Sequence, residues 1–395
     1  MLRTALSIFI LGAFLVFPSP LRAQWDIDAT AQAGLQAHQN VFKSPRALRT
    51  GGQRLGADSL IQSDLVRQYR WALDAERTLG ARHELEAAYE SSLQHYQTFD
   101  TQNEQQHDLE LSYGFEASDA WALEGEVSRR WNRSVGTNVL GDQLSRVFSY
   151  RQWELAPEVS WTVSETTSLK LTYQRRWRTY NTQEGLAPLS YDGQRGVLIG
   201  WLRFEEADRP QWVFTRIQIR QKDYREYRAR NRAGQQAPSH PTNRLQYASA
   251  RVKYNIDLNE DLSWNVGTML RRRADPFEGY YDYWYTRLDS GVEWDVAPTT
   301  TLEAEVRWRR YRYDAKDAPQ PSRDTSPSLR YDYLDGSLRA AHNLRPYLTA
   351  YARVATDRRQ SNVELRSRRT RRSYSLNTAT IGLRMSLSRL YRRVR

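Results

Sequence analysis

Cysteine is absent from the 395 residues, which excludes disulfides, thiolate metal sites, cysteine nucleophiles and lipid anchoring through cysteine. Lysine is scarce, because five of the 58 basic residues are lysine and the other 53 are arginine. Bases outnumber acids by 12. A soluble protein with this balance would be expected to bind nucleic acid. The N-terminus indicates export, so we expect no nucleic-acid partner.

Beyond the N-terminal residues, the sequence also has no long hydrophobic run. Arg3 precedes an apolar run of about fourteen residues, and Pro18 and Pro20 end it before a small residue, Ala23. This pattern predicts a cleaved signal peptide over 1–23 and a mature chain over 24–395; a retained anchor helix is the alternative. No later stretch reaches the roughly 18 apolar residues that a spanning helix needs.

The mature chain is instead dominated by a period of two. Trp153, Leu155 and Val159 alternate with Gln152 and Glu154, and the same pattern recurs in many segments. Alternation places successive side chains on opposite faces of a strand, so it predicts strands with one apolar and one polar face. The hairpin unit around 163–180 recurs around 296–313, with no helix between its strands, and this favours an antiparallel meander.

The connections between these strands alternate in length. Short turns are predicted near 78–82, 117–120, 164–167, 206–210, 258–261, 297–300 and 343–346, and longer polar connections near 44–59, 98–106, 134–146, 181–194, 223–244, 274–280, 314–327 and 357–372. They join about sixteen strands, within a range of about 14 to 18. An even count with strict alternation is typical of an all-β transmembrane antiparallel up-and-down barrel. A soluble β-sandwich is the alternative.

The placement of aromatic residues extends this pattern. Tyr69, Trp71, Trp131, Trp177 and Trp308 lie towards the long connections, and Phe115, Trp121, Trp161, Trp264 and Trp294 towards the turns, as in two interfacial girdles. The final apolar alternation from Ile381 to Tyr391 is similar to a terminal assembly signal, although four residues follow the aromatic. The chain therefore resembles bacterial outer-membrane β-barrel proteins, porin-like in general architecture. This resemblance implies contact with outer-membrane lipids and the barrel assembly machinery.

The polar face carries the charges, which we expect to line a hydrated pore because a charge facing lipid costs about 2–4 kcal/mol at the midplane. The predicted pore-lining acids are Asp74, Glu76, Glu84, Glu86, Glu90, Glu110, Glu124, Glu126, Glu154 and Glu158. The predicted pore-lining bases are Lys170, Arg176, Arg178, Arg216, Arg220, Lys222, Arg251, Lys253, Arg271 and Arg273. Opposed acidic and basic walls would create a transverse field. The alternative is a ladder of ion pairs that fills the lumen.

Arginine also crowds the long connections. Arg368, Arg369, Arg371 and Arg372 are predicted to form a rim that binds the phosphates of lipopolysaccharide, since arginine binds phosphate bidentately. A solvated basic rim without a ligand is the alternative. The long connections are expected to face outward and the short turns the periplasm.

Catalytic patterns are weak. The six histidines include no helical metal-binding pair and no HExxH motif, and no glycine-rich phosphate loop is present. His95 and His107, with Asp108, are the best candidates for a hydrolase site, but polar residues are expected there in any barrel. The sequence therefore predicts a protein that is not an enzyme and uses no metal or cofactor.

These observations favour a passive outer-membrane channel for small hydrophilic solutes, because sixteen strands leave room for an aqueous lumen. An export conduit for an anionic polysaccharide is the second hypothesis, based on the arginines and on Tyr247, Tyr283, Tyr285 and Tyr351. A closed structural or adhesive barrel is the third. The sequence does not indicate an oligomeric state.

Overall fold

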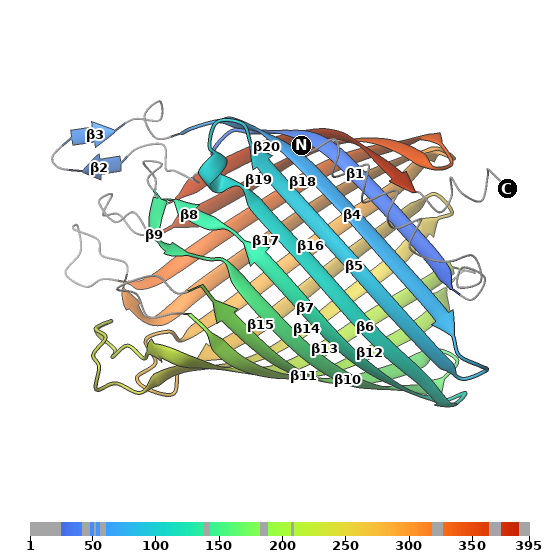
Figure 1. Ribbon diagram of the computed structural model, residues 1–395, viewed down its shortest axis with the longest axis horizontal. Coiled ribbons are helices and arrows are strands. Elements are labelled where there is room, and N and C mark those ends of the chain that lie inside the picture. The colour runs from blue at the N-terminus through green and yellow to red at the C-terminus, as the bar shows by residue number, and fades with distance from the viewer. Residues whose placement is uncertain are drawn as a thin grey trace.

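Sixteen strands close into one antiparallel barrel in the computed structural model, which describes residues 25–41, 48–50, 53–55, 61–137, 143–181, 189–206, 209–317, 327–362 and 373–386 (Figure 1). The barrel strands are β1 (Asp26–His38), β4 (Asp64–Thr78), β5 (His83–Tyr96), β6 (Glu104–Ser118), β7 (Trp121–Arg133), β10 (Tyr150–Ser164), β11 (Thr167–Tyr180), β12 (Tyr191–Glu206), β13 (Arg209–Arg228), β14 (Thr242–Asn259), β15 (Leu262–Ala274), β16 (Tyr283–Ala297), β17 (Thr300–Asp317), β18 (Ser328–Arg345), β19 (Leu348–Ser361) and β20 (Tyr374–Ser386). The predicted fold and strand number are confirmed.

Each strand pairs with the barrel strands that precede and follow it in the chain, as in an up-and-down barrel. The first and last strands close the cylinder through nine paired positions, from Thr30 opposite Ser386 to His38 opposite Thr378. Closure leaves no free edge that could pair with another chain.

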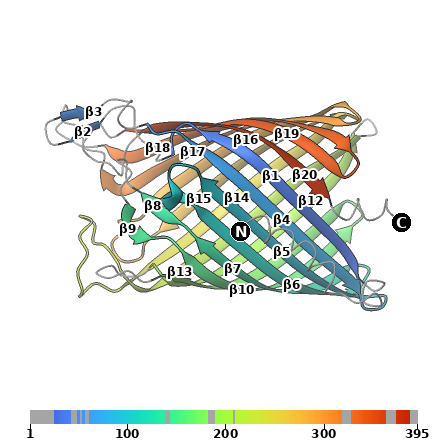
Figure 2. The ribbon, with the colours of Figure 1, turned by 45° about the horizontal axis from the view of Figure 1, so that its top comes forward.

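The two ends of the barrel differ in their connections. The seven predicted short turns each fall between consecutive strands and lie together at one end. The longer connections lie at the other end, and they include two small hairpins, β2 (Leu48–Thr50) with β3 (Gln53–Leu55) and β8 (Val135–Thr137) with β9 (Gln143–Val147) (Figure 2).

The exposure of side chains is inverted relative to a soluble protein. On β10, the apolar Trp153 and Leu155 are 47% and 43% exposed, whereas Gln152 and Glu154 are buried. Ile219, on the outer face of β13, is 69% exposed. An apolar outer face around a polar interior suits a hydrocarbon surrounding, so it excludes the β-sandwich alternative.

The aromatic residues of the predicted girdles share this outer face. Trp121 and Trp161 stack across β7 and β10 with ring centroids 5.3 Å apart. At the other end of the same strands, the Arg129 guanidinium lies over the rings of Trp131 and Trp153, at 4.4 and 4.8 Å. Such amphipathic pairs are suited to the depth of lipid headgroups.

Helix is nearly absent from the described residues, where the assigned helical element is a short 3-10 turn, η1 (Asp100–Gln102). No helix in that part of the chain is long and apolar enough to cross a membrane.

The closure between β1 and β20 depends on glycine. Tyr351, from β19, reaches over both strands, and its hydroxyl accepts a hydrogen bond from Gln32 Nε2 at 2.8 Å. A Cβ at Gly34 would lie 2.7 Å from that hydroxyl, and a Cβ at Gly382 would collide with the same phenol and with the Ala33 carbonyl oxygen. Both glycines therefore leave space that the tyrosine and the neighbouring backbone occupy.

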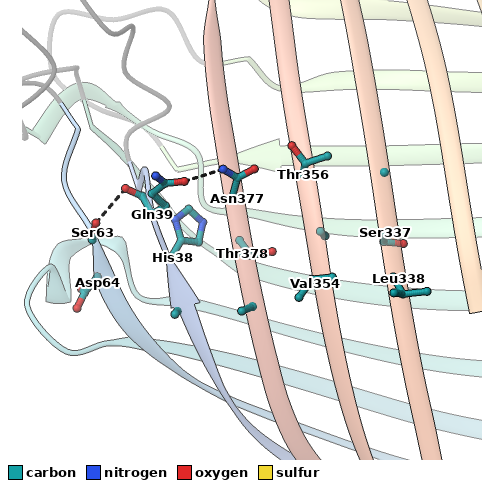
Figure 3. Close-up of a pocket in the computed structure, with 14 residues that line it drawn as sticks. His38, Gln39, Ser63, Asp64, Ser337, Leu338, Val354, Thr356, Asn377 and Thr378 are labelled. Atoms are coloured by element: carbon teal, nitrogen blue, oxygen red, sulfur yellow. Dashed lines mark hydrogen bonds between the residues drawn. The ribbon is translucent and has the colours of Figure 1, made fainter. Parts of the chain in front are cut away.

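A groove of about 690 Å³ lies beside this closure, at the long-connection end (Figure 3). Its lining is mostly small or apolar, and Asn377 donates a hydrogen bond to the Gln39 side chain at 2.7 Å on its rim. Asp64, at the same rim, accepts backbone N–H bonds from Leu65 and from residues 98 and 99 at 2.8–3.1 Å. These contacts give Asp64 a structural role in holding the connection after β5.

Candidate functional site in the barrel lumen

The register and the alternation of burial place all twenty predicted charged residues on the inward face of the barrel. One row of paired residues shows the pattern: Asp108, Arg130, Gln152, Arg178 and Tyr191 are directly opposite one another on five successive strands. The charged positions are therefore neighbours in space around a common interior. Whether solutes pass over them stays a prediction.

Acidic residues cluster on the inner face from β4 to β10. Carboxylates are directly opposite each other at Glu76 and Glu86, and at Glu124 and Glu158. Like charges in directly opposite positions destabilise a sheet, so this wall retains a negative potential at a cost in stability. We call it the acidic wall.

Basic residues cluster on the inner face from β11 to β15, which we call the basic wall. Arg195 is directly opposite Arg220, and Arg216 is directly opposite Arg251. The Nε atoms of Arg195 and Arg216 are buried and have no hydrogen-bond partner in the described structure. Guanidinium groups whose N–H donors have no partner can bind an anion. Arg195 was not among the bases predicted from the sequence, although it alternates with Gly193 and Val197 on the same face of the strand.

Ion pairs join the two walls where they meet. Across β10 and β11, Glu154 pairs with Arg176 at 2.6 Å, and Glu158 pairs with Lys170. The centres of the walls, on β6 and β13, are five strands apart in the ring of sixteen. The walls are thus adjoining and not diametrically opposed, because consecutive segments of an up-and-down barrel are always neighbours.

Most of the remaining inner face, from β16 to β20, is mixed, and a cavity of about 380 Å³ lies between these strands and Arg251, Lys253 and Asn265 of β14 and β15. Asp289 pairs there with Arg287 at 2.7 Å and with Arg251 at 3.2 Å, so one carboxylate forms ion pairs with two guanidinium groups. Arg309 pairs with Asp335 at 2.7 Å, whereas the buried Arg307 Nε has no hydrogen-bond partner in the described structure. The predicted ladder of ion pairs therefore exists in this sector, together with unpaired basic groups.

Above these charges, near the long connections, tyrosines form an arc on the inner face. We call it the tyrosine belt; its members are Tyr150, Tyr180, Tyr191, Tyr224, Tyr247, Tyr283, Tyr285, Tyr311, Tyr313, Tyr331, Tyr333 and Tyr374. The rings touch across strands, as where Tyr311 lies 4.7 Å from Tyr285 and 5.7 Å from Tyr333 between centroids. Tyr247, Tyr283 and Tyr285 were singled out from the sequence, but the contacts between rings on neighbouring strands depend on the strand register.

The connection between β15 and β16 leads into the belt at Tyr283 and contains a buried carboxylate, Asp275. Asp275 accepts hydrogen bonds from the backbone N–H groups of Phe277, at 3.1 Å, and Tyr281, at 3.4 Å. Burial raises the pKa of Asp275, the two backbone hydrogen bonds oppose this shift, and the nearby Asp282 adds to it.

This pKa shift predicts that the local stability of the connection between β15 and β16 depends on pH. Because the folded pKa of Asp275 lies above its ordinary value, protonation favours the folded connection, and its local stability should rise as pH falls from neutral through that pKa. Hydrogen exchange of the Tyr281 amide, corrected for intrinsic rates, should show more protection in mildly acidic solution. The Gly234 amide, which donates to the Asn231 carbonyl, is the control. Equal pH dependence at both amides would contradict the prediction.

The histidines singled out from the sequence lie on the opposite face. His107 faces outward on β6, where its Nδ1 contacts the Tyr89 hydroxyl at 2.8 Å. Asp108 points inward and pairs with Arg130, and His95 is opposite Arg67. The structure therefore does not bring His95, His107 and Asp108 into one site. Within the described ranges, no group of three metal-binding side chains occurs.

Two further predictions fall outside the described residues. The predicted rim of Arg368, Arg369, Arg371 and Arg372 lies in 363–372, and the predicted signal peptide lies in 1–24. The terminal Tyr391 is also outside them.

Comparison with known proteins gives similarity in fold. No family model matches the chain, and no curated protein matches it. OmpT, an outer membrane protein of Vibrio cholerae, is 10% identical, with a TM-score of 0.47 over 92% of this chain and 99% of its own. Pseudomonas putida OprB is 9% identical, with a TM-score of 0.48 over 93% and 95%. Pseudomonas aeruginosa OccK3 is 11% identical, with a TM-score of 0.45 over 91% and 95%.

The prediction that the protein is not an enzyme requires correction. It was based on the absence of linear catalytic motifs, but neighbouring strands can bring catalytic groups together without any such motif. The exclusion of an enzyme therefore does not hold, and the matches to OmpT, at 10% identity and TM-scores of 0.45 to 0.47, assign no activity.

The barrel's own features therefore classify the protein. They are a closed ring of sixteen antiparallel strands, an apolar and aromatic outer face, a charged interior and connections that are short at one end and long at the other. The chain has the fold of a bacterial outer-membrane β-barrel protein, as the sequence predicted.

Proposed function

We propose that the protein is an outer-membrane channel for passive diffusion of small hydrophilic solutes. One observation carries the proposal: the interior has walls of like charge, with carboxylates opposite carboxylates and guanidinium groups opposite guanidinium groups. Such groups need water or mobile counterions around them, because unpaired charges are costly to bury in a dry interior. A hydrated lumen of sixteen strands can conduct solutes.

Liposome swelling tests this function directly. Proteoliposomes that contain the protein should swell when diluted into isotonic arabinose, and more slowly in the larger raffinose, because passage through a pore falls with solute size. Swelling no faster than that of protein-free liposomes would favour the closed structural barrel over the channel.

The topology that this function requires can be tested without a background thiol, because the natural chain has no cysteine. In whole cells, a membrane-impermeant maleimide should label Gln236→Cys, in the long connection after β13, and should not label Thr299→Cys, in the turn before β17. Labelling of Thr299→Cys alone would reverse the proposed orientation. Both variants should be labelled after the cells are lysed, which controls for thiol reactivity.

A further inference from the structure

Cationic side chains lie against the tyrosine belt in a repeated arrangement. The Arg178 guanidinium is 4.0 Å from the Tyr150 ring centroid, and the Arg273 guanidinium is 4.1 Å from that of Tyr283. The Lys222 ammonium lies 4.6 Å from the centroid of the buried Tyr191 ring. Each pair combines a flat apolar surface with a positive charge.

These cations are not neutralised by carboxylates. In the described structure, no carboxylate lies within 4.0 Å of the charged nitrogens of Arg178, Lys222, Arg271 or Arg273. Buried nitrogens of Arg271 and Arg273 also have no hydrogen-bond partner there. The acidic wall is on the other side of the ion-paired boundary at β10 and β11, so an anion in the lumen would be driven towards the cations of the belt.

The chemistry of these groups indicates the ligand class. Guanidinium groups bind carboxylates through two parallel hydrogen bonds, and tyrosine rings provide large, rigid contact surfaces with a polar edge. The belt runs from β10 to β20, eleven neighbouring strands, which at about 4.8 Å per strand is an arc of roughly 48 Å. Several separate carboxylates can therefore be bound at once.

We propose that the tyrosine belt is a binding surface for acidic oligosaccharides, in which sugar rings pack on tyrosines and their carboxylates pair with Arg178, Lys222 and Arg273. This assignment deepens the proposed channel function, on which it rests, by naming a class of solute. A sugar acid can contact both the tyrosine rings and the cationic side chains of the belt. A neutral sugar can contact only the rings, and an inorganic anion only the cations.

Block of single-channel current in planar bilayers tests the assignment. Tri-galacturonate should reduce the current at a concentration at least about tenfold lower than galacturonate, maltotriose or sulfate does. This wild-type comparison needs no variant. Equal potency of sulfate would show attraction of anions by charge alone, and equal potency of maltotriose would show stacking alone; either result would overturn the assignment.

Two variants locate the surface. Arg178→Gln with Arg273→Gln should raise the half-blocking concentration of tri-galacturonate about tenfold and leave that of maltotriose unchanged, because it removes two charge-assisted contacts. Tyr311→Leu should weaken block by both sugars. Tyr173→Leu, on the outer face of β11 where the side chain is 48% exposed, is the matched control and should change neither. Unchanged tri-galacturonate block in the arginine variant would reject this location.

A calorimetric titration separates the binding surface from the channel. If the detergent-solubilised wild-type protein binds tri-galacturonate but bilayers show no current steps, the channel function fails and the binding surface stands. If bilayers show current steps but titration detects no preference for tri-galacturonate over maltotriose, the channel stands and the binding surface fails.

Discussion

Replacing Arg216, Arg220 and Arg251 together by Gln is expected to shift the permeability of the lumen towards cations by about three- to tenfold. At roughly 8 Å in water, each charge contributes about 0.5 kcal/mol to the energy of a passing ion, so three sum to about 1.5 kcal/mol before salt screening. The measurement is the reversal potential across a planar bilayer in a tenfold KCl gradient. All three residues are on the basic wall, and Arg216 is directly opposite Arg251.

The acidic wall supplies the matched control. Glu110→Gln with Glu124→Gln and Glu126→Gln removes the same number of charges of opposite sign from the inner faces of β6 and β7. Its reversal potential should move towards that of an anion-preferring pore. Shifts of the same sign in both triple variants, or no shift in the arginine variant, would contradict the assignment of the walls.

Gly382→Ala is expected to lower the free energy of unfolding by about 1–3 kcal/mol, the range observed when side chains are forced into filled space. The new methyl group would meet the Ala33 carbonyl oxygen of β1 and the Tyr351 phenol, and the backbone oxygen cannot move away without disturbing the pairing that closes the barrel. The melting temperature should fall, and the shift in electrophoretic mobility between heated and unheated samples should weaken.

Gly125→Ala is the control for this substitution, because a Cβ at Gly125 meets no atom within 4 Å. Gly382→Ala combined with Tyr351→Ala removes the phenol but keeps the backbone conflict, so this double variant should remain less stable than Tyr351→Ala alone. Melting temperatures of Gly382→Ala and Gly125→Ala that agree would show that the β1–β20 closure tolerates a side chain at this position.

The barrel was predictable because its strands obey a strict period of two and its connections alternate in length. The boundaries were less predictable. The sequence placed a long connection over 223–244, whereas β13 continues to Arg228 and β14 begins at Thr242. The polar residues there, such as Asp223, suggested a loop, but backbone hydrogen bonding extends a strand beyond the membrane regardless of side-chain polarity.

The charged interior was predictable in composition but not in arrangement. Alternation indicated that Glu154 and Arg176 face the same way, but their ion pair depends on the register between β10 and β11. The adjoining geometry of the walls and the contacts within the tyrosine belt likewise arise from pairing between strands. A single sequence contains no direct signal for that register.

The most direct test of the central claim, that the inward face lines a conducting aqueous lumen, uses one pair of neighbouring residues on β14. Ser249 is buried and faces inward between Gln218 and Arg271 of the flanking strands, whereas Ala250 is exposed on the outer face. A negatively charged methanethiosulfonate reagent should reduce the single-channel current of Ser249→Cys in discrete steps and leave that of Ala250→Cys unchanged. A current through Ser249→Cys that the reagent does not alter, although the thiol reacts once the protein is denatured, would contradict it.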